Sequence, residues 1–367
     1  MPQQLTIRQA VLWFVMYQIG SAFLLLPSSL AGIAGRDAWL SIIVSISLHL
    51  LLLPLYASIA KQMKGRSISA YLNDMLGNVT GAVLTSLFVL LVPFLIFIMT
   101  MKNLGEFITT SIAPDMPEDV IYALMSIAVF TAIRGGVQII GRTAEILFFI
   151  LPVLYLFVIV ALLPYTRPDQ LLPIAEYGWK PIVRASITLL AFPYLEVPLF
   201  LALVPYLKNA QAWRKAVLRS SLISGAMYLV MMAHVIAAVG GKVTANMTFA
   251  SYIIVRMISI GNFIERFEII IAIMWYISIF FRLTLLMFVS VREASLALRL
   301  KDENALLIPA LLIAFVAAPS IWPNLTFLYE FFQQWPIYAM NFGIAAPALL
   351  WFIGRIKPRR QRVQTQE

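Results

Sequence analysis

The amino-acid sequence predicts an all-α integral membrane protein with ten transmembrane helices, arranged as two inverted halves of five. Three observations predict this fold class: an apolar composition, ten long apolar runs, and matching interruptions in the first and the sixth run. Of the 367 residues, 61% are hydrophobic and only 12% are charged. A soluble domain does not bury that much apolar surface, whereas lipid accommodates it on the outer face of a protein.

Each apolar run is expected to be a helix, because lipid offers no partner for an unpaired backbone N–H or C=O group. Most runs have roughly the 20 residues that a bilayer requires. The predicted spans are residues 6–34, 38–60, 81–111, 118–136 and 141–164 in the first half, and 181–206, 214–240, 265–290, 304–321 and 334–354 in the second. The segment 246–262 is too polar and too short for a span, so we expect an interfacial or re-entrant helix there.

The chain is therefore predicted to form a single transmembrane domain over residues 1–367. Repeat one covers about residues 6–164 and repeat two about residues 181–354, followed by the basic tail 355–367. Eighteen of the 27 Lys and Arg residues fall near the amino terminus, in alternate loops and in this tail. Cytoplasmic loops carry an excess of Lys and Arg, so both termini are expected in the cytoplasm. The tail is also basic enough to rest on anionic lipid head groups.

The composition argues against several other classes of protein. The sequence has no cysteine, and its two histidines stand alone in apolar runs, so neither a metal site nor a catalytic triad is expected. We expect no cofactor and no enzymatic activity. The net charge of +10 is spread between the apolar runs, which is typical of membrane topology and not of a nucleic-acid-binding patch.

The first predicted span is interrupted at its centre by "QIGSAFLLLP", residues 18–27. Unwinding at Gly20–Ala22 is expected to free N–H groups near Phe23 to Pro27, which can hold a carboxylate, and carbonyl groups, which can accept from an ammonium group or a cation. The small side chains of Gly20, Ser21 and Ala22 would let a ligand approach the backbone.

The sixth predicted span carries a matching interruption, "AFPYLEVPLF", residues 191–200. Pro193 and Pro198 flank Glu196, and each proline removes a backbone N–H and clashes with the preceding turn. Five spans is an odd number, so the two halves have opposite orientations. One kink alone is usually structural, but paired interruptions in inverted halves indicate a ligand site near the bilayer midplane.

These motifs, together with "LTIRQAVLWFVMYQIGSAFLLLP" at the start and "GRSISAYLNDMLG" at residues 65–77, resemble the spore-germination receptor B-subunit family. That family lies within the amino acid–polyamine–organocation superfamily of LeuT-like transporters. The resemblance covers nearly the whole chain and implies a five-plus-five inverted-repeat fold. It also implies a germinant-sensing role in the inner membrane of bacterial spores, with a membrane A subunit and a lipoprotein C subunit as partners. Where the family commonly has a second glycine, this chain has Ala22, whose methyl group narrows the expected cavity.

The resemblance, combined with the charges inside the spans, suggests particular site residues. The residues expected to line the ligand site are Gly20, Ser21, Ala22, Phe23, Thr100, Asn103, Leu104, Phe192, Tyr194, Glu196, Phe281 and Thr284. Ionisable groups at membrane depth are costly, which makes them functional candidates. Glu196 is the foremost of these, as a ligand, proton or ion site, although it also suits a structural role at the unwound backbone.

Arg282 lies near the middle of span eight, beside the expected inner half of span one, where sodium-coupled relatives of the family hold a cation. A guanidinium group there is a permanent positive charge. Glu145 is its expected partner, and an ordinary brace between helices is the alternative. Lys102 and Glu106 are four residues apart on span three, so they share a face. They are expected either to form a self-neutralising pair or to act as an outer gate.

The predicted function is that of a nutrient-germinant receptor subunit that binds a small zwitterion, most simply an amino acid, and signals through its partner subunits. The alternative is a proton-coupled amino-acid transporter that completes an alternating-access cycle, because a receptor and a carrier need the same site. His49 and His234 are expected to make hydrogen bonds between helices rather than to sense protons.

Overall fold

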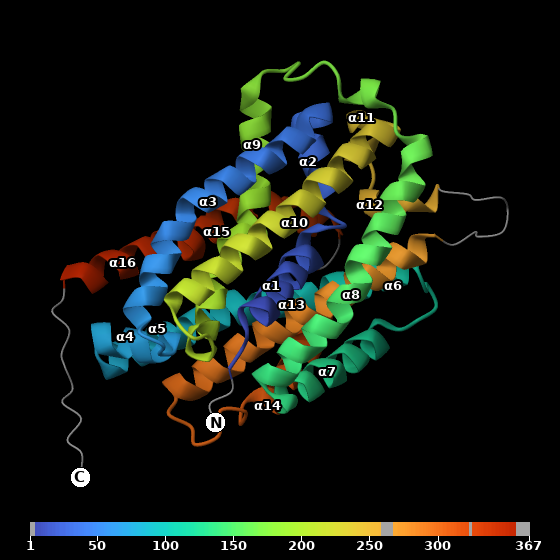
Figure 1. Ribbon diagram of the computed structural model, residues 1–367. Helices are drawn as coiled ribbons and strands as arrows, with labels where there is room; N and C mark the ends of the chain where they lie inside the picture. The colour runs from blue at the N-terminus through green and yellow to red at the C-terminus, as the bar shows by residue number, and fades with distance from the viewer. Residues whose placement is uncertain (1–3, 258–266, 323–324, 357–367) are drawn as a thin grey trace, which may run out of the picture.

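The computed structural model describes residues 4–257, 267–322 and 325–356, and this part of the chain contains helices and no strand (Figure 1). Residues 258–262 of the polar segment, residues 357–367 of the basic tail, and the side chains of Ser21 and Ala22 lie outside the described residues. Seven of the described helices are long and apolar enough to cross a membrane.

The first half of the chain is helical over each of its predicted spans. Its helices are α1 (Ile7–Ala22), α2 (Leu26–Ala34), α3 (Ala38–Met63), α4 (Ile68–Leu76), α5 (Asn78–Val89), α6 (Leu95–Ser111), α7 (Glu118–Gly135) and α8 (Val137–Leu162). A π-helical turn, η2 (Leu90–Phe94), joins α5 to α6. The short helix α4 was not predicted, and it forms part of the stretch 65–77 that carries the family resemblance.

The second half has the same helical character. Its elements are α9 (Trp179–Ala191), the 3₁₀ helix η5 (Tyr194–Tyr206), α10 (Ala210–Val239), α11 (Gly241–Ala245), α12 (Ala250–Arg256), α13 (Glu268–Ala297), α14 (Leu307–Ala317), α15 (Leu325–Met340), the π-helical turn η7 (Asn341–Ala345) and α16 (Ala346–Ile356). Shorter 3₁₀ turns connect the remaining segments, among them η6 (Ala318–Ser320). The polar segment predicted as an interfacial or re-entrant helix contains α12.

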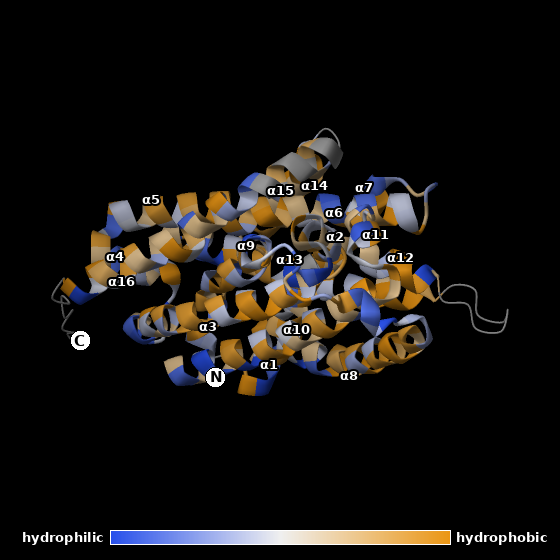
Figure 2. Cartoon of the chain, turned by 90° about the horizontal axis from the view of Figure 1, so that it is seen from above, coloured by the Kyte–Doolittle hydropathy of each residue, from blue (hydrophilic) through white to orange (hydrophobic). Residues whose placement is uncertain are grey.

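Helix α1 lies at the centre of the bundle and packs along both α13 and α10, while α3 packs along α10 and α9 (Figure 1). Hydrophobic residues predominate along most of the helices (Figure 2), and many large apolar side chains are exposed. On α8 the exposed apolar side chains recur every three or four residues, at Ile146, Phe149, Val153, Leu156 and Val160. A stripe of this kind has no partner in water, so it indicates contact with lipid.

The interruption of the first span lies later in the chain than the sequence predicted. Helix α1 continues through Ala22 and α2 starts at Leu26, so the predicted unwinding at Gly20–Ala22 is wrong in position. The physical reason is Pro27, which lacks an N–H group and is accommodated in the first turn of α2. Gly20 serves packing instead: a Cβ atom there would lie 2.5 Å from the carbonyl oxygen of Ser278 on α13.

The sixth predicted span changes from α-helix to 3₁₀ helix. Helix α9 ends at Ala191, and η5 contains Pro198 and Pro205. Neighbouring side chains satisfy carbonyl groups at both interruptions, as irregular backbone inside a membrane requires. The Trp335 indole donates to the Ala191 carbonyl at 3.3 Å, and the Ser251 hydroxyl on α12 donates to the Phe23 carbonyl at 2.8 Å.

Candidate ligand site

A buried ion pair lies where α1, α6, α13 and η5 meet. Arg282 on α13 donates from Nη1 to Glu196 Oε2 at 2.8 Å and from Nη2 to Glu196 Oε1 at 3.0 Å. Both side chains are fully buried. This two-pronged arrangement matches the planar guanidinium to the carboxylate and is the strongest form of such a pair. It joins the proline-rich segment of the second half to the middle of α13.

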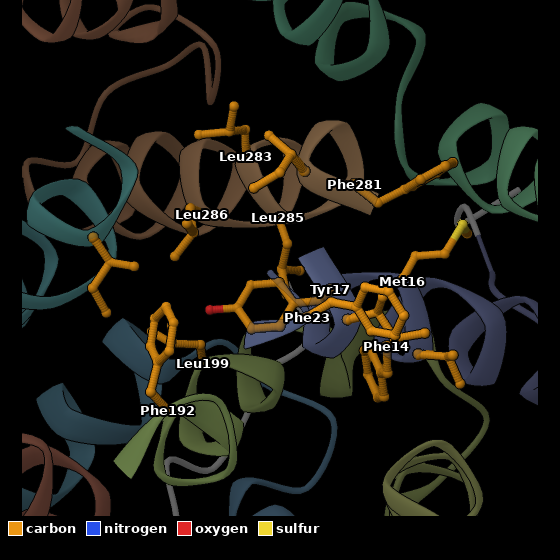
Figure 3. Packing of buried hydrophobic residues seen from close by; sticks show 14 of the residues in the cluster. Phe14, Met16, Tyr17, Phe23, Phe192, Leu199, Phe281, Leu283, Leu285 and Leu286 are labelled. Carbon is orange, nitrogen blue, oxygen red and sulfur yellow. The ribbon is translucent and has the colours of Figure 1, made fainter. Parts of the chain in front are cut away.

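Three further side chains complete the environment of the pair. The Tyr17 hydroxyl on α1 donates to Glu196 Oε2 at 2.7 Å, and Arg282 Nε donates to Thr100 Oγ1 on α6 at 3.3 Å. The guanidinium carbon lies 4.7 Å from the centre of the Tyr17 ring and 4.9 Å from that of Phe192. Figure 3 shows Tyr17 and Phe192 within the apolar core beside α13. Aromatic faces stabilise a cation that has lost its water.

The cluster is electrically neutral, and its members satisfy one another. Burying a charge away from water is expensive, so each member of the pair depends on the other. The bonds to Glu196 and Thr100 engage three of the five N–H donors of Arg282. An incoming group with both a negative and a positive end can divide this pair, because it offers a carboxylate to Arg282 and an ammonium group to Glu196.

The predicted pairing of Arg282 with Glu145 is wrong. Glu145 on α8 instead accepts from Gln9 Nε2 at 3.1 Å and lies 3.9 Å from Arg8 Nε, near the start of α1. The sequence places Glu145 and Glu196 on different spans but does not show which of them faces α13. Helix packing decides that Glu196 is the partner.

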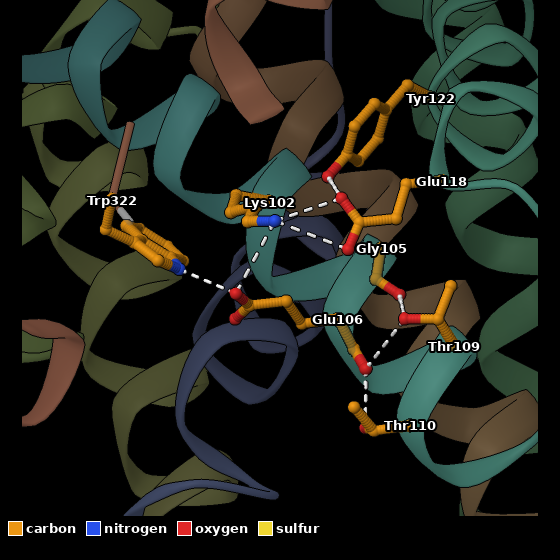
Figure 4. Close-up of polar contacts among 8 residues, drawn as sticks. All are labelled: Lys102, Gly105, Glu106, Thr109, Thr110, Glu118, Tyr122 and Trp322. Atoms are coloured by element: carbon orange, nitrogen blue, oxygen red, sulfur yellow. Dashed lines mark hydrogen bonds and ion pairs between the residues drawn. The ribbon is translucent and has the colours of Figure 1, made fainter. Parts of the chain in front are cut away.

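Lys102 and Glu106 lie 3.6 Å apart on α6, and they belong to a larger cluster (Figure 4). Lys102 Nζ also lies 3.0 Å from Glu118 Oε2 at the start of α7. Trp322 donates its indole N–H to Glu106 at 2.8 Å, and Tyr122 donates its hydroxyl to Glu118 at 2.7 Å. The cluster therefore links α6, α7 and the segment after α14. Neither of the two predictions for Lys102 and Glu106, a self-neutralising pair or an outer gate, included these additional partners.

The remaining predicted ligand residues are placed as follows. Phe23, Leu104, Phe281 and Thr284 are buried, and the hydroxyl of Thr284 has no hydrogen-bond partner among the described residues. Asn103 is half-buried on α6. Of the predicted residues, the structure brings Glu196, Arg282, Thr100 and Phe192 into one cluster. It does not bring Glu145, Lys102 or Glu106 into that cluster.

Tyr194 faces a second buried polar network, which is formed by side chains of α1, α3 and α10. Its ring stacks on His49 at 4.8 Å. His49 Nε2 lies 3.0 Å from Ser221 Oγ, and Gln18 Nε2 donates to the same hydroxyl at 3.2 Å. His49 therefore makes the contact between helices that was predicted. His234 does not, because its Nδ1 lies 2.7 Å from the carbonyl of Val230 on its own helix.

Two important residues were missed from the sequence. Tyr17 directly precedes the interruption motif at residues 18–27. A tyrosine hydroxyl in the middle of an apolar run needs a hydrogen-bond partner, and this requirement could have marked Tyr17 as a site residue. Glu293, near the carboxyl end of α13, is fully buried and accepts from the backbone N–H groups of Ser69 at 2.8 Å and Ile68 at 3.4 Å. These amides open α4, so Glu293 fixes that helix to α13.

Comparison with known proteins agrees with this architecture. A family model described as spore germination protein matches residues 4–324. The chain is 25% identical to spore germination protein KB of Bacillus subtilis over 98% of this chain and 96% of that protein. It is 27% identical to spore germination protein XB of Bacillus anthracis over 70% of this chain and 71% of that protein.

Among solved structures, the chain is similar to Mhp1, a nucleobase-cation-symport-1 family transporter in a closed conformation with bromovinylhydantoin bound. The TM-score is 0.67 at 12% identity, covering 95% of this chain and 78% of that one. At that identity the likeness shows the fold alone, which is that of LeuT-like transporters. These comparisons point to a non-enzymatic membrane protein.

Proposed function

The chain belongs to the spore germination protein family, and from that premise we propose that it is a germinant-receptor subunit that binds a small zwitterion, most simply an amino acid. The observation that carries the proposal is the buried pair of Arg282 and Glu196, held against Tyr17 and Phe192. Two opposite charges at one buried point are the complement of a molecule that carries both charges on adjacent atoms.

The chemistry of binding follows from exchange of partners. The ligand carboxylate takes N–H donors of Arg282, and the ligand ammonium takes an oxygen of Glu196. Charge is conserved at every point of this exchange, so neither buried ion is left unpaired. The N–H groups at the start of α2, just after the interruption at residues 23–25, provide a further anion-binding element. Of the other predicted ligand residues, we extend the proposal to the buried side chains of Phe23, Leu104, Phe281 and Thr284, as further surroundings of the same site.

The overall arrangement forms part of the proposal. Helices α1 and α2 together are one span that is broken near its centre, and α9 with η5 is its counterpart in the second half. Ten spans in two inverted halves of five then place both termini in the cytoplasm, in keeping with the distribution of Lys and Arg. In a spore this membrane is the inner one. A membrane A subunit and a lipoprotein C subunit read the change of state.

Signalling needs two conformations that bind the ligand unequally. Opening of the Arg282–Glu196 pair separates α13 from η5 at the midplane. Movement of α13 reaches α4 through the buried carboxylate of Glu293, which holds the first amides of that helix. Helix α4 lies at the predicted cytoplasmic end, where a partner subunit is accessible. Lys102 and Glu106 act on the opposite side, as the outer gate.

A proton-coupled amino-acid carrier is the second candidate, and the transporter fold of the structural neighbour favours it. The two candidates differ in one measurable property. A receptor binds its ligand without moving it, whereas a carrier moves it across the membrane at each cycle. Uptake of radiolabelled amino acid into proteoliposomes with an inward proton gradient distinguishes them. Sustained accumulation would establish the carrier.

Binding of amino acids, sugars and nucleosides to the purified chain in lipid nanodiscs tests the proposed function. We expect saturable binding of one or more amino acids and strongly weakened binding in Glu196→Gln. The matched control is Glu176→Gln, since Glu176 also pairs with an arginine, Arg36 at 3.3 Å, but near the surface. Binding of a sugar or a nucleoside alone would overturn the zwitterion assignment. Equal affinity in wild type and Glu196→Gln would remove the buried pair from the site.

A further inference from the structure

Two adjoining pockets lie where the end of α3, the end of η5 and the start of α10 meet. The larger has a volume of about 600 Å³ and is lined by Lys61, Lys64 and Lys208 among its polar residues. The smaller, about 370 Å³, extends toward the start of α1 and adds Lys215. The two share Lys208, Asn209 and Gln211 as lining residues, so they form one continuous basic groove.

The groove has an unbalanced positive charge. Its lining residues include four lysines and no carboxylate. All four lysines are exposed, and none of them forms an ion pair with another described residue. Positive charges gathered around a hollow repel one another unless an anion lies between them. The groove therefore has the chemistry of a site for a phosphate or a carboxylate group.

Helix α10 continues from this groove onto the lipid-facing surface. Its exposed residues recur at helical spacing and change from polar to apolar along one face; in chain order they are Gln211, Lys215, Arg219, Leu222, Ala226 and Val230. The first two line the groove. An anion seated among the lysines therefore has an apolar helix face directly beyond it, toward the middle of the membrane.

Helix α3 shows the same pattern in the opposite chain direction. Its exposed positions include Ile43, Ser47, Leu51 and Pro54, and at the same spacing the face ends at Lys61. Lys61 lines the larger pocket. Helices α3 and α10 pack along each other, so two apolar faces lead away from one basic groove (Figure 1).

We propose that this groove binds the head group of an anionic phospholipid, whose acyl chains lie along the exposed faces of α3 and α10. A basic pocket between membrane helices, at the depth where apolar side chains give way to lysine, suits a phosphate that is attached to hydrocarbon. A free phosphate would interact only with the lysines, so it does not account for the apolar faces of α3 and α10. An acidic peptide would also be attracted by the lysines, but it would not contact the apolar faces that run toward the bilayer core.

The site has a direct connection to η5, which carries Glu196. Val204 and Leu207, at the end of that element and just beyond it, line the larger pocket. A bound head group therefore contacts the end of the segment whose other end forms the buried pair. The lipid site does not depend on the proposed germinant function, because it rests on the groove, its lysines and the two apolar faces.

The test compares two variants that remove the same charge in nanodiscs of phosphatidylglycerol or phosphatidylcholine. The groove variant is Lys61→Gln with Lys208→Gln. The control is Arg134→Gln with Lys301→Gln, two exposed basic residues predicted on the same membrane face but outside the groove. Native mass spectrometry after release counts the retained lipid molecules, and thermal melting measures protection by each lipid.

We expect wild type and control to retain phosphatidylglycerol and to melt at a higher temperature with it. The groove variant should bind it about 30-fold less tightly, because each of the two lysines near the surface contributes about fivefold to the affinity for an anionic lipid. Equal loss in both double variants would overturn the site in favour of general surface attraction. Protection of wild type in phosphatidylcholine by inorganic phosphate, or by a polyglutamate peptide, to the same degree as by phosphatidylglycerol would overturn the lipid assignment.

Discussion

Glu196→Gln tests whether the buried pair is a true charge pair, and the structure gives the size of the effect. Glu196 accepts two bonds from Arg282, at 2.8 and 3.0 Å, and one from Tyr17, at 2.7 Å. The amide of glutamine keeps one acceptor oxygen and turns an N–H₂ group toward the other guanidinium donor. At least one bond to Arg282 is then lost, and the guanidinium remains buried without an opposite charge.

Removing one partner of a buried pair costs about 3–5 kcal/mol, because the other charge is left uncompensated. We therefore expect the free energy of unfolding to fall by about 3–5 kcal/mol in Glu196→Gln. The control Glu176→Gln removes a carboxylate from a pair in which both side chains are 35% exposed. Surface pairs contribute about 0–1 kcal/mol, so this variant should stay close to wild type.

Arg282→Gln completes a double-mutant cycle. The single variant leaves Glu196 buried without its cation and should be as unstable as Glu196→Gln. The double variant carries no buried charge and places two amides side by side, so its loss should be smaller than the sum of the two singles by about 2–3 kcal/mol. Equilibrium unfolding in a reversible detergent titration measures all four proteins, with melting in nanodiscs as a second readout.

Two results would refute the reasoning. One is a Glu196→Gln protein as stable as the Glu176→Gln control, since that would mean the carboxylate is not compensating a buried charge. The other is strict additivity of the two single variants, since that would mean the two side chains do not interact. Ligand binding is read separately: loss of one charge-assisted hydrogen bond should weaken amino-acid binding by roughly 10- to 150-fold.

Three further predictions follow from the structure. Gly20→Ala should lower the free energy of unfolding by about 1–3 kcal/mol, because the new methyl group would meet the α13 backbone. Gly32→Ala is the control and should be neutral or slightly stabilising, because the space around its Cβ position is open. Unfolding titrations in detergent measure both variants, and equal effects would contradict close packing of α1 on α13. Because Arg282 is a permanent cation beside α1, amino-acid binding should change less than about twofold when potassium or choline replaces sodium; strict sodium dependence in isothermal titration would exclude this role. Glu293→Gln should destabilise the protein by about 1–3 kcal/mol and increase hydrogen exchange at the first amides of α4, with unchanged exchange as the result that counts against the link.

Much of the fold was open to prediction because lipid imposes one rule on every span. The apolar runs had to be helices, and the prolines around Glu196 and after Gly20 favoured interruptions near them. Composition and the apolar runs were therefore sufficient for an all-helical membrane fold, and the quoted motifs carried the resemblance that identified the family. They were also sufficient to single out Glu196 and Arg282, since an ionisable side chain in an apolar run is conspicuous by itself.

The tertiary structure alone decided which of these residues meet. Glu145 and Glu196 are both carboxylates in apolar surroundings, yet only Glu196 faces Arg282, because this depends on the rotation of α8 and α13 about their axes. Gly20 was predicted to line a ligand cavity, yet it lies against the α13 backbone, a contact 258 residues away along the chain. Hydropathy and local sequence fix where a helix begins and ends, but the direction in which each side chain points is set by the packing of helices that are distant in sequence.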